Sequence, residues 1–281
     1  MSCSQGKYRD QNGLLPLKNQ VPSILETGTG PLVVLVHSSV SGARQWRRLM
    51  TSLENRFHLI AINLFGYGGT IKWEEDRMQT LDDQVCLLRN ILPDDIESFC
   101  IVGHSFGGSV AMKAASLLKD KIFRLVLIEP NPFTLLKDNG KTDAFNEAVE
   151  LKNCVKQCGA ENNWKTAAER FANYWGGQDS WKNMSSERKE AFTESLQPNY
   201  FEWDAVLNDK TSLQQWKDNL PNQTLVISAK KTAKPTREIF ELMRKNCKNW
   251  TFREIEEGGH MAPLTRPDLV NPIIEEFICA N

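Results

Sequence analysis

The pentapeptide GHSFG at residues 103–107 decides the fold of this chain. It follows a short apolar run rich in strand-forming residues, Phe99–Val102, and precedes a run of small residues that suits a helix, Gly108–Ala115. A strand, a sharp turn and a helix in this order place Ser105 on a nucleophile elbow, with its hydroxyl exposed above a sheet. The flanking glycines let the turn be tight, because a side chain there would collide with neighbouring backbone. The context favours a nucleophilic Ser105 over an idle serine in a glycine-rich connection.

A serine nucleophile needs a base, and the chain contains only four histidines, His37, His58, His104 and His260. His260 lies in the loop EGGHMAP, residues 257–263, after an expected strand at 250–255 and before an expected closing helix at 267–279. A histidine on a late Gly-Gly loop fits the chain order Ser, acid, His. His260 is therefore the predicted base. His58 begins an apolar run and is interpreted as structural, while His104 is expected to pack beside the nucleophile.

A third segment, LVVLVHSSVSG at residues 32–42, combines a buried strand with a loop. Together with the elbow it resembles the α/β-hydrolase superfamily, whose members often carry His-Gly where this chain has His37-Ser38. The resemblance implies an oxyanion hole built from two backbone N–H groups. Carried over by position, the donors are those of Ser39 and Phe106, and backbone donors require no particular side chain. His37 is expected to hold this loop rather than to transfer a proton.

The resemblance covers most of the chain. INLFGYG at 62–68 resembles the exit of the family's fourth strand, with Asn63 in the usual Asp place, while 123–130 resembles strand six and 224–228 strand seven. An early edge strand is expected at 23–28. The implied fold is an α/β hydrolase with a mostly parallel central sheet flanked by helices. A helical cap between strands six and seven is expected at 131–216, and the core domain at 1–130 and 217–281.

The periodicity of the chain agrees with this division. Strands and helices alternate up to Glu129, with helices expected near 43–53, 81–92 and 106–118. Parallel pairing with right-handed crossovers follows from such alternation. From 131 to 215 no strong strand is predicted, and helices are expected at 144–158, 164–175 and 186–196.

The catalytic acid is where this chain departs from the family. The usual acid follows strand seven, but the loop SAKKTAKP at 228–235 contains no carboxylate, and Thr232 occupies the expected Asp position. Its three lysines would repel a histidinium. A minority of family members place the acid after strand six, where this chain has Glu129. Glu129 is the predicted acid, and a Ser-His dyad or an acid from the cap, such as Asp204, remains the alternative.

The expected cap is rich in aromatic residues, most of which should form its own core. Large rings with few charges suit an apolar or aromatic acyl or alcohol group. The residues predicted to contact substrate are His37, Ser38, His104, Trp175, Trp181, Trp203 and Met261.

The composition bounds the functional classes. The chain has 281 residues, 41% hydrophobic and 25% charged, with a net charge of -1, which argues against an electrostatic grip on nucleic acid or acidic membranes. It contains no apolar run long enough for a transmembrane helix and no apolar signal core. Seven scattered cysteines indicate reduced thiols in the cytoplasm. We expect a small-molecule substrate, no cofactor and no metal, and the sequence leaves the oligomeric state undetermined.

The sequence thus predicts a serine hydrolase that cleaves a small apolar or aromatic ester or lactone through an acyl-enzyme on Ser105. A serine nucleophile argues against haloalkane dehalogenase and epoxide hydrolase chemistry, which use a carboxylate in this fold. Thioester and C–C bond hydrolysis on the same triad remain open. A hydrolase scaffold that serves as a non-catalytic small-molecule receptor is the competing class, and the missing acid after strand seven is its best support.

Overall fold

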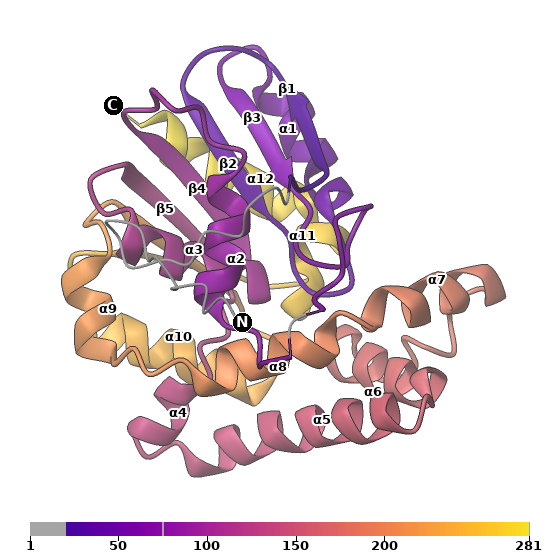
Figure 1. Cartoon of the computed structure of the whole chain (residues 1–281). Helices are drawn as coiled ribbons and strands as arrows, with labels where there is room; N and C mark the ends of the chain where they lie inside the picture. Colours follow the sequence, from indigo (N-terminus) through magenta and orange to yellow (C-terminus); the bar gives the residue numbers. More distant parts are fainter. Residues whose placement is uncertain (1–20, 75, 281) are drawn as a thin grey trace, which may run out of the picture.

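A seven-stranded sheet organises the protein (Figure 1), for which a computed structural model describes residues 21–74 and 76–280. The strand order is β1-β3-β2-β4-β5-β6-β7, and β1 runs antiparallel to β3 while the other neighbours are parallel. The strands are β1 (Ile24–Thr27), β2 (Leu32–Val36), β3 (His58–Ile62), β4 (Phe99–His104), β5 (Ile122–Ile128), β6 (Thr224–Ala229) and β7 (Thr251–Ile255).

The central strands are apolar along their whole length because both faces of the sheet are covered. Every residue of β2 is buried, and its side chains alternate between two cores. Val34 and Val36 belong to one hydrophobic cluster, and Val33 and Leu35 to the other. Near-continuous apolar strands of this kind are typical of parallel sheets between helical layers.

Helices cover the two faces of the sheet. One hydrophobic cluster joins the sheet to η1 (Ala43–Trp46), α1 (Arg47–Leu53), α11 (Ala262–Thr265) and α12 (Pro267–Cys279). The other cluster joins it to α2 (Leu81–Arg89), α3 (Phe106–Leu117) and α10 (Lys234–Asn246). In Figure 1, α2 and α3 lie in front of the sheet and α12 lies behind it.

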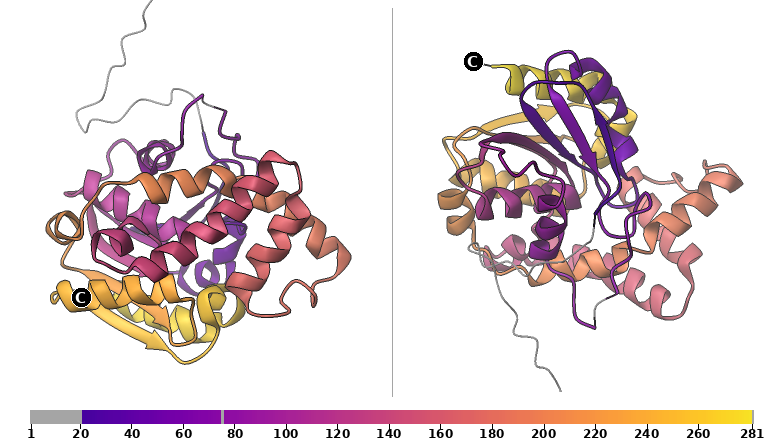
Figure 2. Two further views of the ribbon diagram at one scale, coloured as in Figure 1. Left: turned by 90° about the horizontal axis from the view of Figure 1, so that it is seen from below. Right: turned by 45° about the horizontal axis from the view of Figure 1, so that its top comes forward.

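Six helices lie between β5 and β6. They are α4 (Thr134–Asp138), α5 (Thr142–Ala160), α6 (Trp164–Gly176), α7 (Ser186–Leu196), α8 (Asn199–Asn208) and α9 (Leu213–Asn219). We call residues 131–216 the helical insertion. Helix α8 contacts α3 on one side and α5 on the other, so it lies between the core and the outer helices (Figure 1). Seen from below, α5 and α6 lie across the end of the sheet (Figure 2).

The α/β-hydrolase fold predicted from the sequence is confirmed. Helices α7 and α12 have the predicted bounds, whereas α2 ends at Arg89 and short turns carry the chain to Leu92. Helices α4, α8, α9 and α10 were not predicted. In the order of the described strands the insertion lies between β5 and β6, which are the strands that the family resemblance numbers six and seven.

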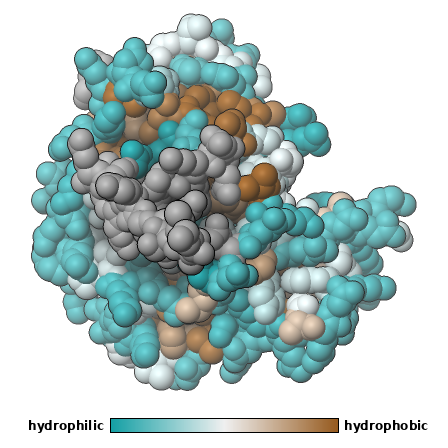
Figure 3. All heavy atoms as spheres, in the orientation of Figure 1, coloured by the Kyte–Doolittle hydropathy of each residue, from teal (hydrophilic) through white to brown (hydrophobic). Residues whose placement is uncertain are grey.

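The surface of the insertion is mainly polar. In Figure 3 the part at lower right, where α6 and α7 project, is largely hydrophilic, in keeping with the charged sequence of α7. Within 21–74 and 76–280, no helix has the length and apolar content needed to cross a membrane.

Candidate active site

Ser105 lies on a strained turn between β4 and α3. Its backbone has φ 54° and ψ −120°, a conformation that a residue with a side chain rarely adopts. Glycines on both sides of Ser105 let neighbouring backbone segments approach closely. A Cβ on Gly103 would meet the backbone of Gly107, and one on Gly107 would meet the backbone of His37. The turn thus holds Ser105 at the start of α3, where the first N–H groups have no partner within the helix.

Three side chains form a continuous hydrogen-bonded line. Ser105 Oγ lies 2.9 Å from His260 Nε2, and His260 Nδ1 lies 2.6 Å from Glu129 Oε2. All three residues are buried. An ionised carboxylate only accepts hydrogen bonds, so Nδ1 carries the proton and Nε2 is free to accept the proton of the Ser105 hydroxyl. The predicted nucleophile, base and acid therefore meet in the order that general-base activation of a serine requires.

Glu129 is held by the ends of two strands. It follows β5 with φ 44°, and its Oε1 accepts hydrogen bonds from Ala229 N at 2.8 Å and Ser228 Oγ at 3.1 Å. Its Oε2 accepts from Thr232 Oγ1 at 2.6 Å as well as from His260. Burial by itself raises the pKa of Glu129, but the hydrogen bond and charge of His260, together with these donors, bring the pKa below its ordinary value. Glu129 is therefore held in its ionised form.

The alternative acids lie elsewhere. Asp204 forms an ion pair with Lys156 at 2.6 Å. In the loop after β6, Lys230 pairs with Glu256 at the surface instead of facing the histidine. Thr232, in the position where the family usually has its acid, donates to the acid that this chain places after β5.

His104 holds the backbone of His260 in place through a hydrogen bond from its side chain. Its Nε2 lies 2.8 Å from the carbonyl oxygen of His260, and its Nδ1 lies 3.2 Å from Gln45 Nε2. Since a carbonyl only accepts, Nε2 is the donor and the ring is neutral. Burial, followed by the nearby His260, lowers the pKa of His104 far below its ordinary value. Gln45 Oε1 in turn accepts from the backbone N–H of Ser38 at 3.1 Å, so one amide connects the loop after β2 to the histidine loop.

His37 and Ser38 hold the loop after β2 and do not line the small cavity at Ser105, and their role as substrate contacts stays a prediction. His37 Nδ1 lies 2.7 Å from Ser38 O, and its Nε2 accepts from Leu64 N at 3.1 Å. Both ring nitrogens are therefore occupied, and burial lowers the pKa of His37 to about 4. His104 is likewise absent from the cavity wall, because its two nitrogens face Gln45 and His260.

Ser39 and Phe106 line a small cavity beside Ser105, with a volume of about 10 Å³. Their backbone N–H groups are the predicted oxyanion donors. The Ser39 hydroxyl donates to Glu202 Oε2 at 2.5 Å and accepts from Asn199 Nδ2 at 3.2 Å. Both partners belong to α8, so the helical insertion holds the loop that follows β2.

A larger groove of about 490 Å³ runs beside this cavity, and Ser39, Phe171 and Trp175 line both. The Trp175 ring lies over His260, with 4.1 Å between ring centroids. Met261 lines the groove, as predicted for a substrate contact, and Trp203 lines the small cavity. Trp175 is thus part of the wall of both the space at Ser105 and the groove.

Trp181, also predicted to contact substrate, lines neither of these two spaces. Its ring packs edge-on against Phe192 within the insertion, and the Lys189 ammonium lies 5.7 Å from its centroid. The sequence placed it near the pocket only by its closeness in the chain to Trp175.

The α/β-hydrolase family model matches residues 31–267, which include the sheet from β2 onward, the insertion and all three residues of the hydrogen-bonded line. The chain belongs to the α/β-hydrolase fold family. A putative esterase/lipase of Haemophilus influenzae is 21% identical over 267 residues, covering 94% of this chain and 89% of that protein. The (E)-2-((N-methylformamido)methylene)succinate hydrolase of Acinetobacter baylyi is 22% identical over 92% of this chain and 95% of its own length.

Solved structures agree on the fold. A hydrolase from Oleispira antarctica superposes with a TM-score of 0.73 at 21% identity, covering 93% of this chain and 96% of that one. At this identity the likeness shows a shared fold and gives no information about the substrate.

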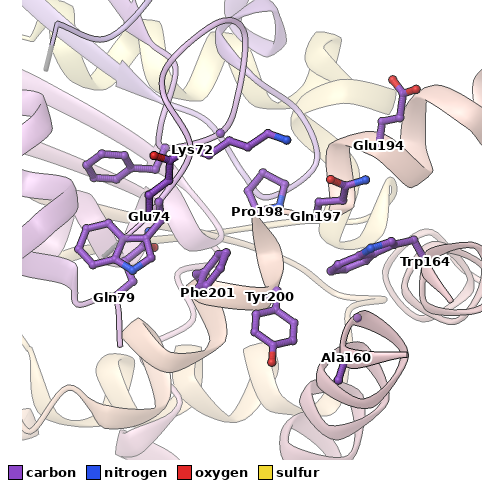
Figure 4. Close-up of a pocket in the computed structure, with 14 residues that line it drawn as sticks. Lys72, Glu74, Gln79, Ala160, Trp164, Glu194, Gln197, Pro198, Tyr200 and Phe201 are labelled. Carbon is purple, nitrogen blue, oxygen red and sulfur yellow. The ribbon is translucent and has the colours of Figure 1, made fainter. Parts of the chain in front are cut away.

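A separate cavity of about 710 Å³ lies between the segment around residues 65–74 and helices α5 to α8 of this α/β hydrolase (Figure 4). Lys72 and Glu74 lie on one side, with Trp164 and Tyr200 on the other. None of the predicted site residues lines it. No group of three or more His, Cys, Asp or Glu side chains that could hold a metal ion occurs within 21–74 and 76–280.

Thr232→Ala is expected to lower kcat by up to about tenfold. The reason is that Thr232 donates a hydrogen bond to the same Glu129 oxygen that His260 contacts. A hydrogen bond to a charged group contributes about 1.5–3 kcal/mol, and the remaining donors keep Glu129 partly oriented. Steady-state kinetics on one ester would measure the loss, and Thr232→Ser should restore activity. An unchanged kcat in Thr232→Ala would contradict this role.

Trp175→Ala is expected to shift preference toward longer acyl chains, because the ring belongs to the walls of both the 10 Å³ cavity and the groove, and its removal enlarges the space beside Ser105. Comparing kcat/KM for acetyl, butyryl and octanoyl esters should show a change of about tenfold or more in their ratios. Trp181→Ala, which removes the same side chain from a position lining neither space, is the matched control. Equal losses on all three esters would indicate a folding effect and reject the pocket role.

Proposed function

We propose that this α/β hydrolase is a serine hydrolase that cleaves small carboxylic esters or lactones through an acyl-enzyme on Ser105. The observation that carries the proposal is the line from Ser105 Oγ through His260 to Glu129, with distances of 2.9 and 2.6 Å. Such geometry activates a hydroxyl as a nucleophile.

The reaction follows from the arrangement. Ser105 Oγ attacks the carbonyl carbon while its proton passes to His260 Nε2. Glu129 keeps the proton on Nδ1 and stabilises the imidazolium that forms. The imidazolium then protonates the leaving alcohol, and a water activated by the same nitrogen releases the acid from Ser105.

The oxyanion is assigned to the backbone N–H groups of Ser39 and Phe106. Both residues line the cavity that contains Ser105, and Phe106 opens α3, whose N-terminus favours negative charge. In comparable sites one such donor is worth about 3 kcal/mol. The Ser39 loop is held by Gln45 and by α8, which keeps the donor in place before the reaction begins.

The groove supports an apolar substrate group. Phe171, Trp175, Phe192, Met261 and Leu264 are among the residues that line its 490 Å³. We assign the helical insertion the role of a cap, since it supplies most of this wall and closes the space over Ser105. An ester is favoured over a thioester or a C–C bond because one relative is named a putative esterase/lipase.

The proposal is tested with a fluorophosphonate probe followed by a substrate panel. An active serine hydrolase is labelled covalently at Ser105, whereas a receptor built on the same scaffold is not. The panel compares p-nitrophenyl esters, lactones and thioesters. Failure of labelling on folded protein would overturn the proposal in favour of the receptor, and labelling with turnover only of thioesters would correct the substrate class.

A further inference from the structure

The cavity at Ser105 contains polar atoms that no protein group satisfies. Nine buried side-chain nitrogen or oxygen atoms lack a hydrogen-bond partner within residues 21–74 and 76–280. Three of them, Asn199 Oδ1, Glu202 Oε1 and Trp203 Nε1, belong to residues of α8 that line this one cavity. Buried polar atoms are rarely left unpaired, so this concentration marks a place for a ligand.

The orientation of the two acceptors is determined by their own neighbours. Asn199 Nδ2 donates to Glu202 Oε2 at 2.8 Å and to Ser39 Oγ at 3.2 Å, which fixes the amide and leaves Oδ1 free. Glu202 Oε2 also accepts from Ser39 Oγ, so Oε1 is the carboxylate oxygen without a partner. Glu202 is 2% exposed, and bulk water therefore does not satisfy Oε1.

The electrostatic surroundings of Glu202 also indicate that a hydrogen-bond donor is missing. Burial raises its pKa, and the hydrogen bonds from Ser39 and Asn199, together with the nearby Tyr67 hydroxyl, lower it only in part. Its charge in turn adds to burial in raising the pKa of Tyr67. The hydrogen bonds to Glu202 come from the neutral hydroxyl of Ser39 and the neutral amide of Asn199. A further donor on a ligand would complete the set.

The chemistry and size of the space define the ligand group. An ammonium only donates, whereas a hydroxyl both donates and accepts, and the cavity wall presents two free acceptors and the indole N–H of Trp203. A volume of about 10 Å³ is about that of one water-sized group. Since Ser105, Ser39 and Phe106 line the same space, the group sits next to the scissile carbonyl.

We propose that the substrate carries a hydroxyl on its acyl part, within two carbons of the scissile carbonyl, and that Glu202 Oε1 accepts the hydrogen bond of this hydroxyl. This inference rests on the proposed ester hydrolysis and names its substrate class. Glu202 is then a specificity residue that contacts substrate, while the apolar groove takes the remainder of the molecule. A site built to bind a hydroxyl discriminates strongly against an analogue that lacks it, because its own buried groups are then left unpaired.

The test compares ester pairs that differ only by hydroxyl and methyl. Ethyl 3-hydroxybutyrate is paired with ethyl 3-methylbutyrate, and ethyl lactate with ethyl 2-methylpropanoate. In the wild type we expect kcat/KM to favour the hydroxy ester of at least one pair by tenfold or more. Glu202→Gln should reduce that ratio to below threefold, while Glu190→Gln, the same change on the exposed surface of α7, should leave it unchanged.

The ratio, and not the absolute rate, is the readout, because Glu202 also holds the Ser39 loop. Wild-type ratios near one for both pairs, in an enzyme that hydrolyses these esters, would overturn the inference without requiring any variant. A preference for ethyl 3-aminobutyrate over both partners would overturn the hydroxyl in favour of an ammonium. Absence of fluorophosphonate labelling at Ser105 would instead show that the proposed function has failed.

Discussion

Ser105→Ala should yield a folded protein whose ester hydrolysis falls by about 10⁴ to 10⁶-fold, in line with the loss of a serine nucleophile in other hydrolases. The change removes one hydroxyl. Within the described residues, the one side chain that this hydroxyl hydrogen-bonds is that of His260. The expected loss is therefore chemical and not structural. Turnover and fluorophosphonate labelling should disappear together, while the melting temperature stays within a few degrees of wild type.

The control for this variant is Ser109→Ala, one turn further along α3. Ser109 Oγ is buried and hydrogen-bonded to Asn131 at 2.8 Å, away from His260. That change should cost some stability, because it leaves Asn131 without its partner, yet it should retain labelling at Ser105. If Ser105→Ala kept turnover at the level of wild type, another nucleophile would be responsible and the whole assignment would be wrong.

Glu129→Gln has the second-largest expected effect, a fall in kcat of about 10² to 10⁴-fold. The amide keeps the size of the side chain, but its NH₂ group can face His260 and favour the tautomer with the proton on Nε2. That tautomer cannot accept the proton of Ser105. The loss should appear in kcat across the whole pH range in which wild type is active, because the low pKa of Glu129 keeps the wild-type carboxylate ionised there.

Asp204→Asn separates Glu129 from the acid of the insertion. Asp204 pairs with Lys156, so its replacement should affect stability slightly and leave kcat close to wild type. The opposite pattern, with a small loss in Glu129→Gln and a large one in Asp204→Asn, would move the acid to the insertion. Comparable small losses in both variants would indicate a Ser-His dyad.

Much of the candidate site could be predicted from local patterns in the sequence. The elbow could be predicted because strand, turn and helix are consecutive in the chain, and Gly103 and Gly107 on either side of Ser105 permit the sharp turn between them. His260 could be predicted because the chain has few histidines and only one on a late glycine loop. Glu129 could be predicted because the loop at 228–235 has no carboxylate, and β5 and β6 end side by side at one edge of a parallel sheet.

The sequence by itself therefore determined the fold and the three residues of the catalytic proposal, since each depends on neighbours in the chain or on adjacent strands. Only the tertiary structure decided which insertion residues face Ser105. The Trp175 ring packs against His260 while Trp181 packs away from it, although the two tryptophans are only six positions apart. Ser39 meets Glu202 across 163 positions, a contact that depends on how α8 packs against the core. Side chains brought together by such packing leave no periodic signal in the sequence, because nothing local requires them to be polar.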